Sequence, residues 1–329
     1  MGKLGNIWKA MLAGGAGVAA LAALNAAIQR SASEPDDSAL GGEAHFFHWK
    51  HGRVFYKRSG LHNSGMPLIF IHGIGAGASS FMWRKNFDDL AIDFPVYALD
   101  LLGFGLSDKP ATASYSADLY VDLISDFIRE VTGYPSNIVA SSLGAAYSIR
   151  VADEHPELVN AMVLNGPSGS DTNRRPGMAG AAFYGLLQSP VLGTSFYNVM
   201  ASERSIRDYA RDNLFYDHRR VTDRVVTNLY ATSHQPGAQH AIAAFLSGYL
   251  NTDARSPFSR LTQPTVLVWG KQDLTTPIQH GASLLEVNPR ARLVIFDYCR
   301  MMPEQENPER FNELVRDAFA VPLSAAATT

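Results

Sequence analysis

The sequence predicts an α/β fold, in which a mostly parallel central sheet carries helices on both faces and a helical lid is inserted once. Two observations predict it. Short, continuously apolar runs alternate with helical patterns along most of the chain, which is typical of parallel strands buried on both faces. Between residues 168 and 261 this alternation stops, and helical spacing continues without a strong strand.

The folded part opens with an antiparallel hairpin, whose strands are expected at His45–Trp49 and Arg53–Lys57. The later strands are expected at Pro67–Ile71, Pro95–Leu99, Asn137–Ala140, Val159–Leu164, Thr265–Trp269 and Arg292–Phe296. Polar or glycine residues follow most of these runs directly. Because sites in parallel sheets form at the carboxyl ends of the strands, we expect the functional side chains to lie at that edge.

Composition narrows the possible functions. The chain has 329 residues, enough for one large domain or one domain with an insertion. Its net charge is −3 and it has no run of Lys and Arg, so no nucleic-acid partner is expected. The single cysteine, Cys299, excludes internal disulfides and the Cys/His spacings of zinc sites. We therefore expect neither a metal nor a cofactor.

The N-terminal segment, residues 1–38, is expected to combine an apolar helix with a polar linker. Lys3 and Lys9 precede an uncharged run rich in Ala and Gly that reaches Gln29. Its length barely matches the roughly 20 apolar residues of a spanning helix. Three interpretations stay open: a membrane anchor or uncleaved signal, a cleaved signal, and an Ala-rich helix of a soluble protein. We expect a helix separate from the core that contacts a membrane through residues 10–28. The protein would then be membrane-associated or exported, and otherwise cytoplasmic.

A serine turn follows the expected strand at Asn137–Ala140. The residues Ala140-Ser141-Ser142-Leu143-Gly144 lead from that strand into a helical pattern of small residues, which is the context of a nucleophile elbow. Such a turn is strained and needs small neighbours, which Ala140 and Gly144 supply. Ser142 is the central residue by register and the candidate nucleophile. The alternative is an ordinary serine at a helix N-cap.

Four further segments lie near the ends of the apolar runs. They are the glycine-rich His72–Ser80, the turn Asp100–Pro110, Trp269–Pro277 and Ala291–Phe311. With the serine turn they cover roughly residues 45 to 320, and in this order they resemble the α/β-hydrolase superfamily. The similar subgroup carries a lid and includes esterases, C–C bond hydrolases, epoxide hydrolases and haloalkane dehalogenases. The last two use an aspartate nucleophile, so Ser142 argues against both.

The resemblance implies an oxyanion hole and a triad acid. The glycine-rich loop is similar to the one that supplies half of the hole, so the N–H groups of Ile74 and Leu143 are expected to form it. A phosphate-binding loop is the alternative, but the loop lacks the required Gly-Lys-Ser/Thr ending. Asp273, after the seventh expected strand, matches the triad acid, and the alternative is a helix-capping aspartate. His72 is expected to be structural.

The position of the triad histidine holds a methionine. The family loop reads Gly-His-x-Pro-x-x-Glu-x-Pro, and an ungapped match places its Gly on Arg300 and its His on Met301. Pro303, Glu306 and Pro308 match the rest of this loop. A thioether can neither take the serine proton nor protonate a leaving group. A substitute base could come from His280, or from His234 or His240 in the lid; otherwise these are surface or packing histidines.

Two functions therefore compete. One is a serine hydrolase for a small, largely apolar ester or related substrate, with weak or altered activity because of Met301. The other is a non-catalytic protein that binds a small apolar ligand on a hydrolase scaffold. A membrane-bound structural protein would leave the serine turn unexplained. In either case, residues 39–167 and 262–322 are expected to form the core and residues 168–261 the lid, while the oligomeric state stays open.

Overall fold

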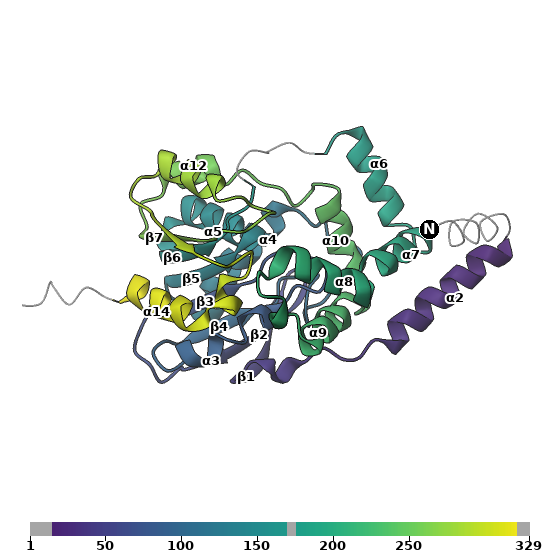
Figure 1. Cartoon of the computed structure of the whole chain (residues 1–329), viewed down its shortest axis with the longest axis horizontal. Coiled ribbons are helices and arrows are strands. Elements are labelled where there is room, and N and C mark those ends of the chain that lie inside the picture. The colour runs from purple at the N-terminus through teal and green to yellow at the C-terminus, as the bar shows by residue number, and fades with distance from the viewer. Residues whose placement is uncertain (1–14, 170–175, 321–329) are drawn as a thin grey trace, which may run out of the picture.

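The chain forms an eight-stranded sheet with helices on both faces (Figure 1), as seen in a computed structural model that describes residues 15–169 and 176–320. The strand order is β1-β2-β4-β3-β5-β6-β7-β8. The strands are β1 (Glu43–Trp49), β2 (Gly52–Ser59), β3 (Leu68–Ile71), β4 (Val96–Leu99), β5 (Ser136–Ser141), β6 (Val159–Asn165), β7 (Thr265–Gly270) and β8 (Arg292–Phe296). Strand β2 pairs antiparallel with β1 and β4, and every later pairing is parallel. The predicted fold class and the N-terminal hairpin are confirmed.

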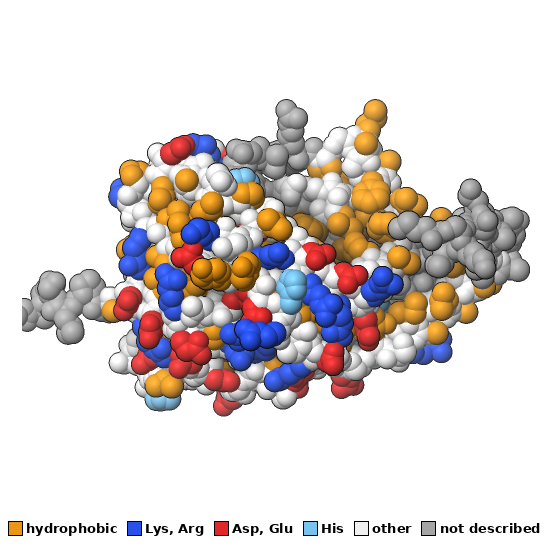
Figure 2. Space-filling model, in the orientation of Figure 1, with side chains coloured by type: hydrophobic (Ala, Val, Ile, Leu, Met, Phe, Trp, Pro, Cys, Tyr) orange, Lys and Arg blue, Asp and Glu red, His pale blue; other side chains and the backbone are white. Residues whose placement is uncertain are grey.

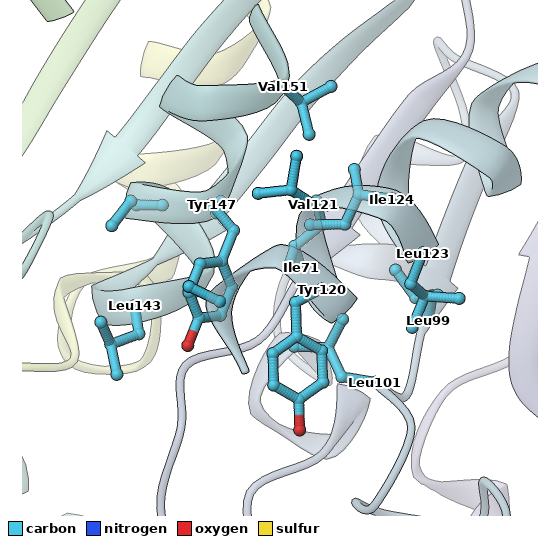
Figure 3. Close-up of a cluster of buried hydrophobic side chains, with 14 of the residues drawn as sticks. Ile71, Leu99, Leu101, Tyr120, Val121, Leu123, Ile124, Leu143, Tyr147 and Val151 are labelled. Carbon is cyan, nitrogen blue, oxygen red and sulfur yellow. The ribbon is translucent and has the colours of Figure 1, made fainter. Parts of the chain in front are cut away.

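Alternate residues of the central strands enter two separate cores, because successive side chains of a strand point to opposite faces. Ile69 and Ile71 of β3 join the core beneath α4 and α5, whereas Leu68 and Phe70 join the core beneath α3 and α14. Figure 3 shows the first of these cores, where the Tyr120 ring of α4 stacks on the Tyr147 ring of α5. The helices around the sheet are α3 (Phe87–Leu90), α4 (Ala117–Phe127), α5 (Ser142–Glu154), α12 (Gln279–Val287), α13 (Pro303–Glu306) and α14 (Pro308–Phe319).

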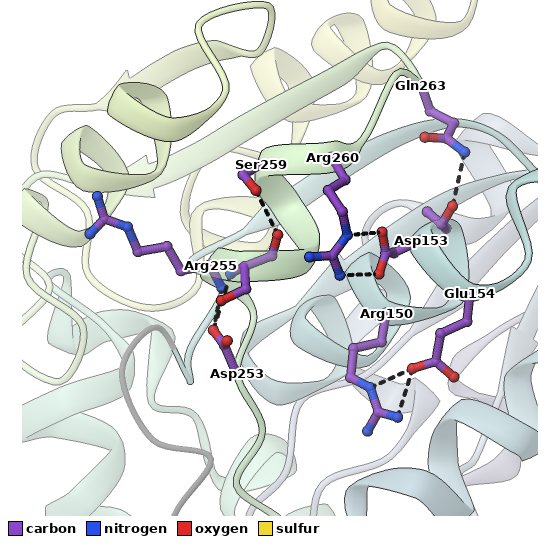
Figure 4. Close-up of polar contacts among 10 residues, drawn as sticks. Arg150, Asp153, Glu154, Asp253, Arg255, Ser259, Arg260 and Gln263 are labelled. Atoms are coloured by element: carbon purple, nitrogen blue, oxygen red, sulfur yellow. Dashed lines mark hydrogen bonds and ion pairs between the residues drawn. The ribbon is translucent and has the colours of Figure 1, made fainter.

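A helical insertion lies between β6 and β7, and its described residues contain no strand. Its helices are α6 (Met178–Leu187), α7 (Leu192–Met200), α8 (Glu203–Tyr209), α9 (Asp223–Ser233), α10 (Ala238–Leu246) and α11 (Arg255–Arg260), with a π-helical turn at Ala210–Leu214. The last helix, α11, packs against α5 and α12 of the core. Figure 4 shows the Arg260 guanidinium paired with the Asp153 carboxylate of α5. The insertion is thus fastened to the core at its C-terminal end.

Helix α2 (Gly15–Ser31) packs on the helical insertion. The prediction of a helix in the N-terminal run is confirmed from Gly15 onward, and residues 10–14 of that run lie outside the described residues. The helix was predicted to be separate from the core, and its contacts in the structure are with α7 of the insertion. Asn25 is buried and donates to the carbonyl of Val191 (3.1 Å) and the hydroxyl of Ser195 (3.0 Å). Its side-chain oxygen accepts a hydrogen bond from the side-chain amide of Asn198 (3.0 Å). These bonds replace the hydrogen bonds to water that the Asn25 amide loses on burial.

Crossing a membrane requires a helix that is both long and apolar. Within residues 15–169 and 176–320, no helix meets both conditions.

Replacing Asn25 with Ala should release α2 from α7. The substitution leaves the buried side chains of Ser195 and Asn198 without this partner, at a cost of about 1–3 kcal/mol. Hydrogen exchange of the α2 amides should then accelerate by about tenfold or more, while the protection of β5 stays the same. Leu24→Ala is the matched control, since the Leu24 side chain is exposed. Unchanged exchange in Asn25→Ala would show that these hydrogen bonds do not hold α2.

Candidate active site

Ser142 occupies a sharp turn between β5 and α5. Its φ angle is 54°, in the left-handed region that non-glycine residues seldom adopt. Strand β5 ends at Ser141 and α5 begins at Ser142, so the turn has no linking loop. Parallel pairing with β3 and β6 holds the strand on both sides. The turn therefore presents the half-buried Ser142 side chain at the carboxyl edge of the sheet.

Glycines allow the loop after β3 to pass very close to this turn. A Cβ on Gly144 would lie 2.4 Å from the carbonyl oxygen of His72, and a Cβ on Gly73 would lie 3.2 Å from the Cβ of Ser142. His72 is fully buried, and desolvation lowers the pKa of its imidazole. Its Nε2 accepts from the Leu101 N–H (3.0 Å) and its Nδ1 donates to the Gly73 carbonyl (2.6 Å). His72 thus has the structural place that the sequence indicates.

The two backbone N–H groups expected to form an oxyanion hole lie on either side of this contact. Ile74 follows Gly73 on the loop, and Leu143 follows Ser142 in the first turn of α5. First-turn N–H groups of a helix have no intrahelical acceptor. Neither N–H has a hydrogen-bond partner among the described residues. No acceptor in the described structure therefore competes with the predicted oxyanion for these two N–H groups.

Ser168 is a neighbour of Ser142 that sequence reasoning missed. Its hydroxyl oxygen lies 3.3 Å from that of Ser142, and its backbone N–H donates to the Ser142 carbonyl (3.3 Å). Ser168 follows β6 by three residues, so the signal available in the sequence was a small polar residue beyond the carboxyl end of a buried strand.

Asp273 is buried beyond the end of β7. Its Oδ1 accepts from the backbone N–H of Thr275 (2.8 Å) and Thr276 (3.1 Å) and from the hydroxyl of Thr275 (2.7 Å). These bonds cap a turn rather than a helix, because α12 begins only at Gln279. The Oδ2 atom faces the end of β6, where a Cβ on Gly166 would lie 3.9 Å away. Among the described residues, no hydrogen bond uses this Oδ2.

The amide of Asn165 joins the loop of Met301 to the strand before Ser142. Its Nδ2 lies within donor distance of the Met301 carbonyl (2.9 Å), the Glu304 Oε2 (3.1 Å) and the Ser141 hydroxyl (3.3 Å). The hydroxyl of Tyr209, at the end of α8, lies 4.0 Å from the Met301 sulfur. Sequence reasoning missed Asn165 and Tyr209. Asn165 could have been found by its position directly after a buried strand.

Tyr209 also lies near Asp273. Burial raises the pKa of the Tyr209 phenol, and the nearby charge of Asp273 raises it further. Tyr209, Asp273 and Met301 therefore share one region beside the helical insertion.

Arg300 connects the loop of Met301 to the insertion. Its guanidinium donates to the backbone carbonyls of Arg211 (2.7 Å) and Asp212, in the π-helical turn after α8. Its backbone N–H donates to Glu306 Oε2 (2.9 Å). The Arg300 side chain thus makes two contacts that a glycine, the residue predicted by the resemblance, could not make.

The three histidines considered as substitute bases make other contacts in the described part of the chain. His234 is buried at the end of α9, where its ring stacks on Tyr230 with centroids 4.0 Å apart. His240 shares a 2.6 Å hydrogen bond with Gln188. Desolvation lowers the pKa of both imidazoles. His280 lies in the first turn of α12. None of the three has a hydrogen bond to Ser142 or Asp273.

A metal site would need several ligating side chains together. In the ranges 15–169 and 176–320, no group of three His, Cys, Asp or Glu residues is placed to hold a metal ion.

Glu304 is a fully buried carboxyl behind the loop of Met301. Desolvation raises its pKa to about 8; a backbone hydrogen bond opposes this rise, the charge of Glu306 adds to it, and the charge of Arg84 opposes it slightly. Its Oε2 accepts from Asn165, whereas its Oε1 has no partner among the described residues. A protonated carboxyl suits this position, since an uncharged group loses less on burial.

Known proteins resemble the chain in sequence and structure. A family model described as alpha/beta hydrolase fold matches residues 66–306. A 2-hydroxymuconate semialdehyde hydrolase of Pseudomonas sp. strain CF600 is 29% identical over 279 residues, which cover 82% of this chain and 93% of that relative. A 2-hydroxy-6-oxo-6-(2'-aminophenyl)hexa-2,4-dienoic acid hydrolase of Metapseudomonas resinovorans is 28% identical over 254 residues, 75% and 81% of the two chains. A solved structure of a meta-cleavage product hydrolase from Pseudomonas fluorescens IP01 aligns with a TM-score of 0.70 at 26% sequence identity. The alignment covers 86% of this chain and 98% of that hydrolase.

Glu304 should make the stability of the protein fall as pH rises. Its pKa is raised from an ordinary value of 4.5 to about 8 on folding, so the folded state binds more protons between these values. The free energy of unfolding should therefore decrease from about pH 4.5 to pH 8. Glu304→Gln should remove this part of the slope in urea unfolding measured from pH 5 to 8. Glu309→Gln, at an exposed position of α14, is the control. Equal slopes in the wild type and Glu304→Gln would contradict the assignment.

Proposed function

The chain belongs to the alpha/beta hydrolase fold family, and from this premise we propose that it is a serine hydrolase with Ser142 as its nucleophile. One observation carries the proposal: Ser142 sits at a left-handed turn beside two N–H groups that have no partner in the described structure. The relatives support hydrolysis, since they are named hydrolases. They do not support esterase activity in particular.

The proposed substrate is small and largely apolar, and it carries a carbonyl group. Several relatives are named for 2-hydroxy-6-oxo acids, so the scissile bond is either an ester bond or a C–C bond beside a ketone. In both reactions, the Ser142 oxygen attacks the carbonyl carbon. The N–H groups of Ile74 and Leu143 then stabilise the negative oxygen that develops.

The proposed chemistry is limited at the proton-transfer step. Attack by Ser142 requires a base for its proton, and the thioether of Met301 cannot serve. The Ser168 hydroxyl can share a hydrogen bond with Ser142 but is too weakly basic to replace an imidazole. Oxyanion stabilisation and binding alone leave an acceleration of about 10³–10⁴ over water. We therefore expect slow turnover.

We propose that the helical insertion is a lid over this site. Its support is the contact of Tyr209 and of the carbonyls of Arg211 and Asp212 with the loop of Met301. The same contacts connect the lid to residues 300 and 301, so a change at either position also affects the lid. A second function, ligand binding without turnover, is favoured by one observation alone, the methionine at position 301.

A fluorophosphonate probe should separate these two functions. Covalent labelling of the purified full-length protein is expected at Ser142, because the probe reacts with nucleophilic serines beside an oxyanion hole. Mass spectrometry should find no label in Ser142→Ala. Ser141→Ala is the matched control and should retain labelling, since the Ser141 side chain is buried. Failure of the wild type to react would contradict the serine hydrolase and support the binding protein.

Installing a base should raise the activity. Turnover of a nitrophenyl acetate by the wild type should be near background, and Met301→His should increase kcat by about tenfold or more, given the roughly 10²–10⁴ typical of general acid–base catalysis. Met302→His, one residue along the same loop, is the control and should change little. The double variant with Arg300→Gly tests whether the loop also needs glycine.

Two outcomes would refute the assignment of the base position. Efficient wild-type hydrolysis that survives Met301→Ala but is lost in His234→Ala or His240→Ala would identify a lid histidine as the base. Efficient hydrolysis that survives all three changes would exclude the assignment altogether.

A further inference from the structure

An exposed apolar face spans three neighbouring helices. Its members are Leu24 of α2, Met178, Phe183 and Leu186 of α6, and Phe196 and Val199 of α7. The exposed fractions reach 92% for Met178 and 63% for Val199. Figure 2 shows hydrophobic side chains gathered over α6 and α7, whereas charged side chains gather over the lower part of the molecule. Contiguous apolar surface of this kind marks an interaction site.

Side-chain contacts hold the three helices together. Phe183 of α6 meets Phe196 of α7 edge to face, with ring centroids 6.4 Å apart. Asn25 fastens α2 to the same helix α7. A shallow apolar groove extends the surface toward α10, with Phe196 on one wall and Leu246 on the other. The apolar face is therefore held in place by side-chain contacts rather than formed by a single helix.

In the sequence, charged residues flank the apolar segments that carry this face but do not interrupt them. No residue from 176 to 202 is charged, and neither is any residue of α2 before Arg30. The charged residues that border these runs are Lys9, Arg30, Arg174, Arg175 and Glu203. Lys9, Arg174 and Arg175 lie outside the described residues. Four of the five bordering charges are positive.

We propose that the apolar face docks on an anionic lipid surface. An apolar face whose flanking sequence is mostly basic suits the membrane interface, where apolar side chains enter the headgroup boundary and Lys and Arg meet anionic headgroups. The alternative occupant is a second copy of the chain. This docking is a peripheral contact of three helices and does not depend on the hydrolase reaction.

Vesicle co-sedimentation of the full-length protein tests the proposal. The wild type should bind vesicles that contain phosphatidylglycerol more tightly than vesicles of phosphatidylcholine alone, and high salt should weaken this binding. Leu186→Glu and Val199→Glu should each reduce the binding by about tenfold or more, because each places a carboxylate in the apolar face. Ile92→Glu is the matched control, since Ile92 is 67% exposed on the core beside α3, and its binding should equal that of the wild type.

Thermal unfolding of each variant checks that the fold is retained. Because the substituted positions are exposed, the melting temperature should stay nearly unchanged. No vesicle binding by the wild type would overturn the proposal. Equal binding by Leu186→Glu, Val199→Glu and the wild type would overturn it as well. A wild-type dimer in light scattering, dissociated by these substitutions and without affinity for vesicles, would assign the face to a second copy of the chain instead.

Discussion

The candidate site depends on one backbone constraint, the left-handed turn that leads from β5 into α5. A non-glycine residue in this conformation costs about 1–3 kcal/mol, so Ser142 can hold it only because its surroundings leave no alternative. Strand β5 is paired on both sides, and α5 is buried along most of one face. The carbonyl of His72 lies so close to Gly144 that any larger residue would push the helix away. The reactive position is thus set by backbone packing.

Polar contacts then arrange the loops around this turn. Asn165 follows β6 and binds the carbonyl of Met301, so the loop after β8 is tied to the centre of the sheet. Arg300 binds two carbonyls of the helical insertion from the same loop. The side chain of Arg300 therefore connects the loop to the insertion. Met301 lies in a loop that several hydrogen bonds hold in place.

In the N-terminal helix, one buried polar residue, Asn25, makes hydrogen bonds that the apolar sequence around it does not indicate. Helix α2 is almost uncharged, which in sequence indicates a segment apart from the folded core. Asn25 turns one side of this helix into a specific contact with α7. Leu21, one turn before Asn25, is also buried, whereas Leu24 is exposed. An apolar and a polar residue thus share the contact of α2 with the insertion.

The sequence by itself determined the strands, the place of the insertion and the position of Ser142, because these follow from local patterns of apolar, small and glycine residues. The spacing of Pro303, Glu306 and Pro308 also led to the prediction that Met301 occupies the position of the triad histidine. Only the tertiary structure decided that Asn165, Ser168 and Tyr209 meet this site and that α2 lies on α7. Those contacts join residues far apart in the chain, and no local pattern records them, since each depends on how strands and helices from different segments come together.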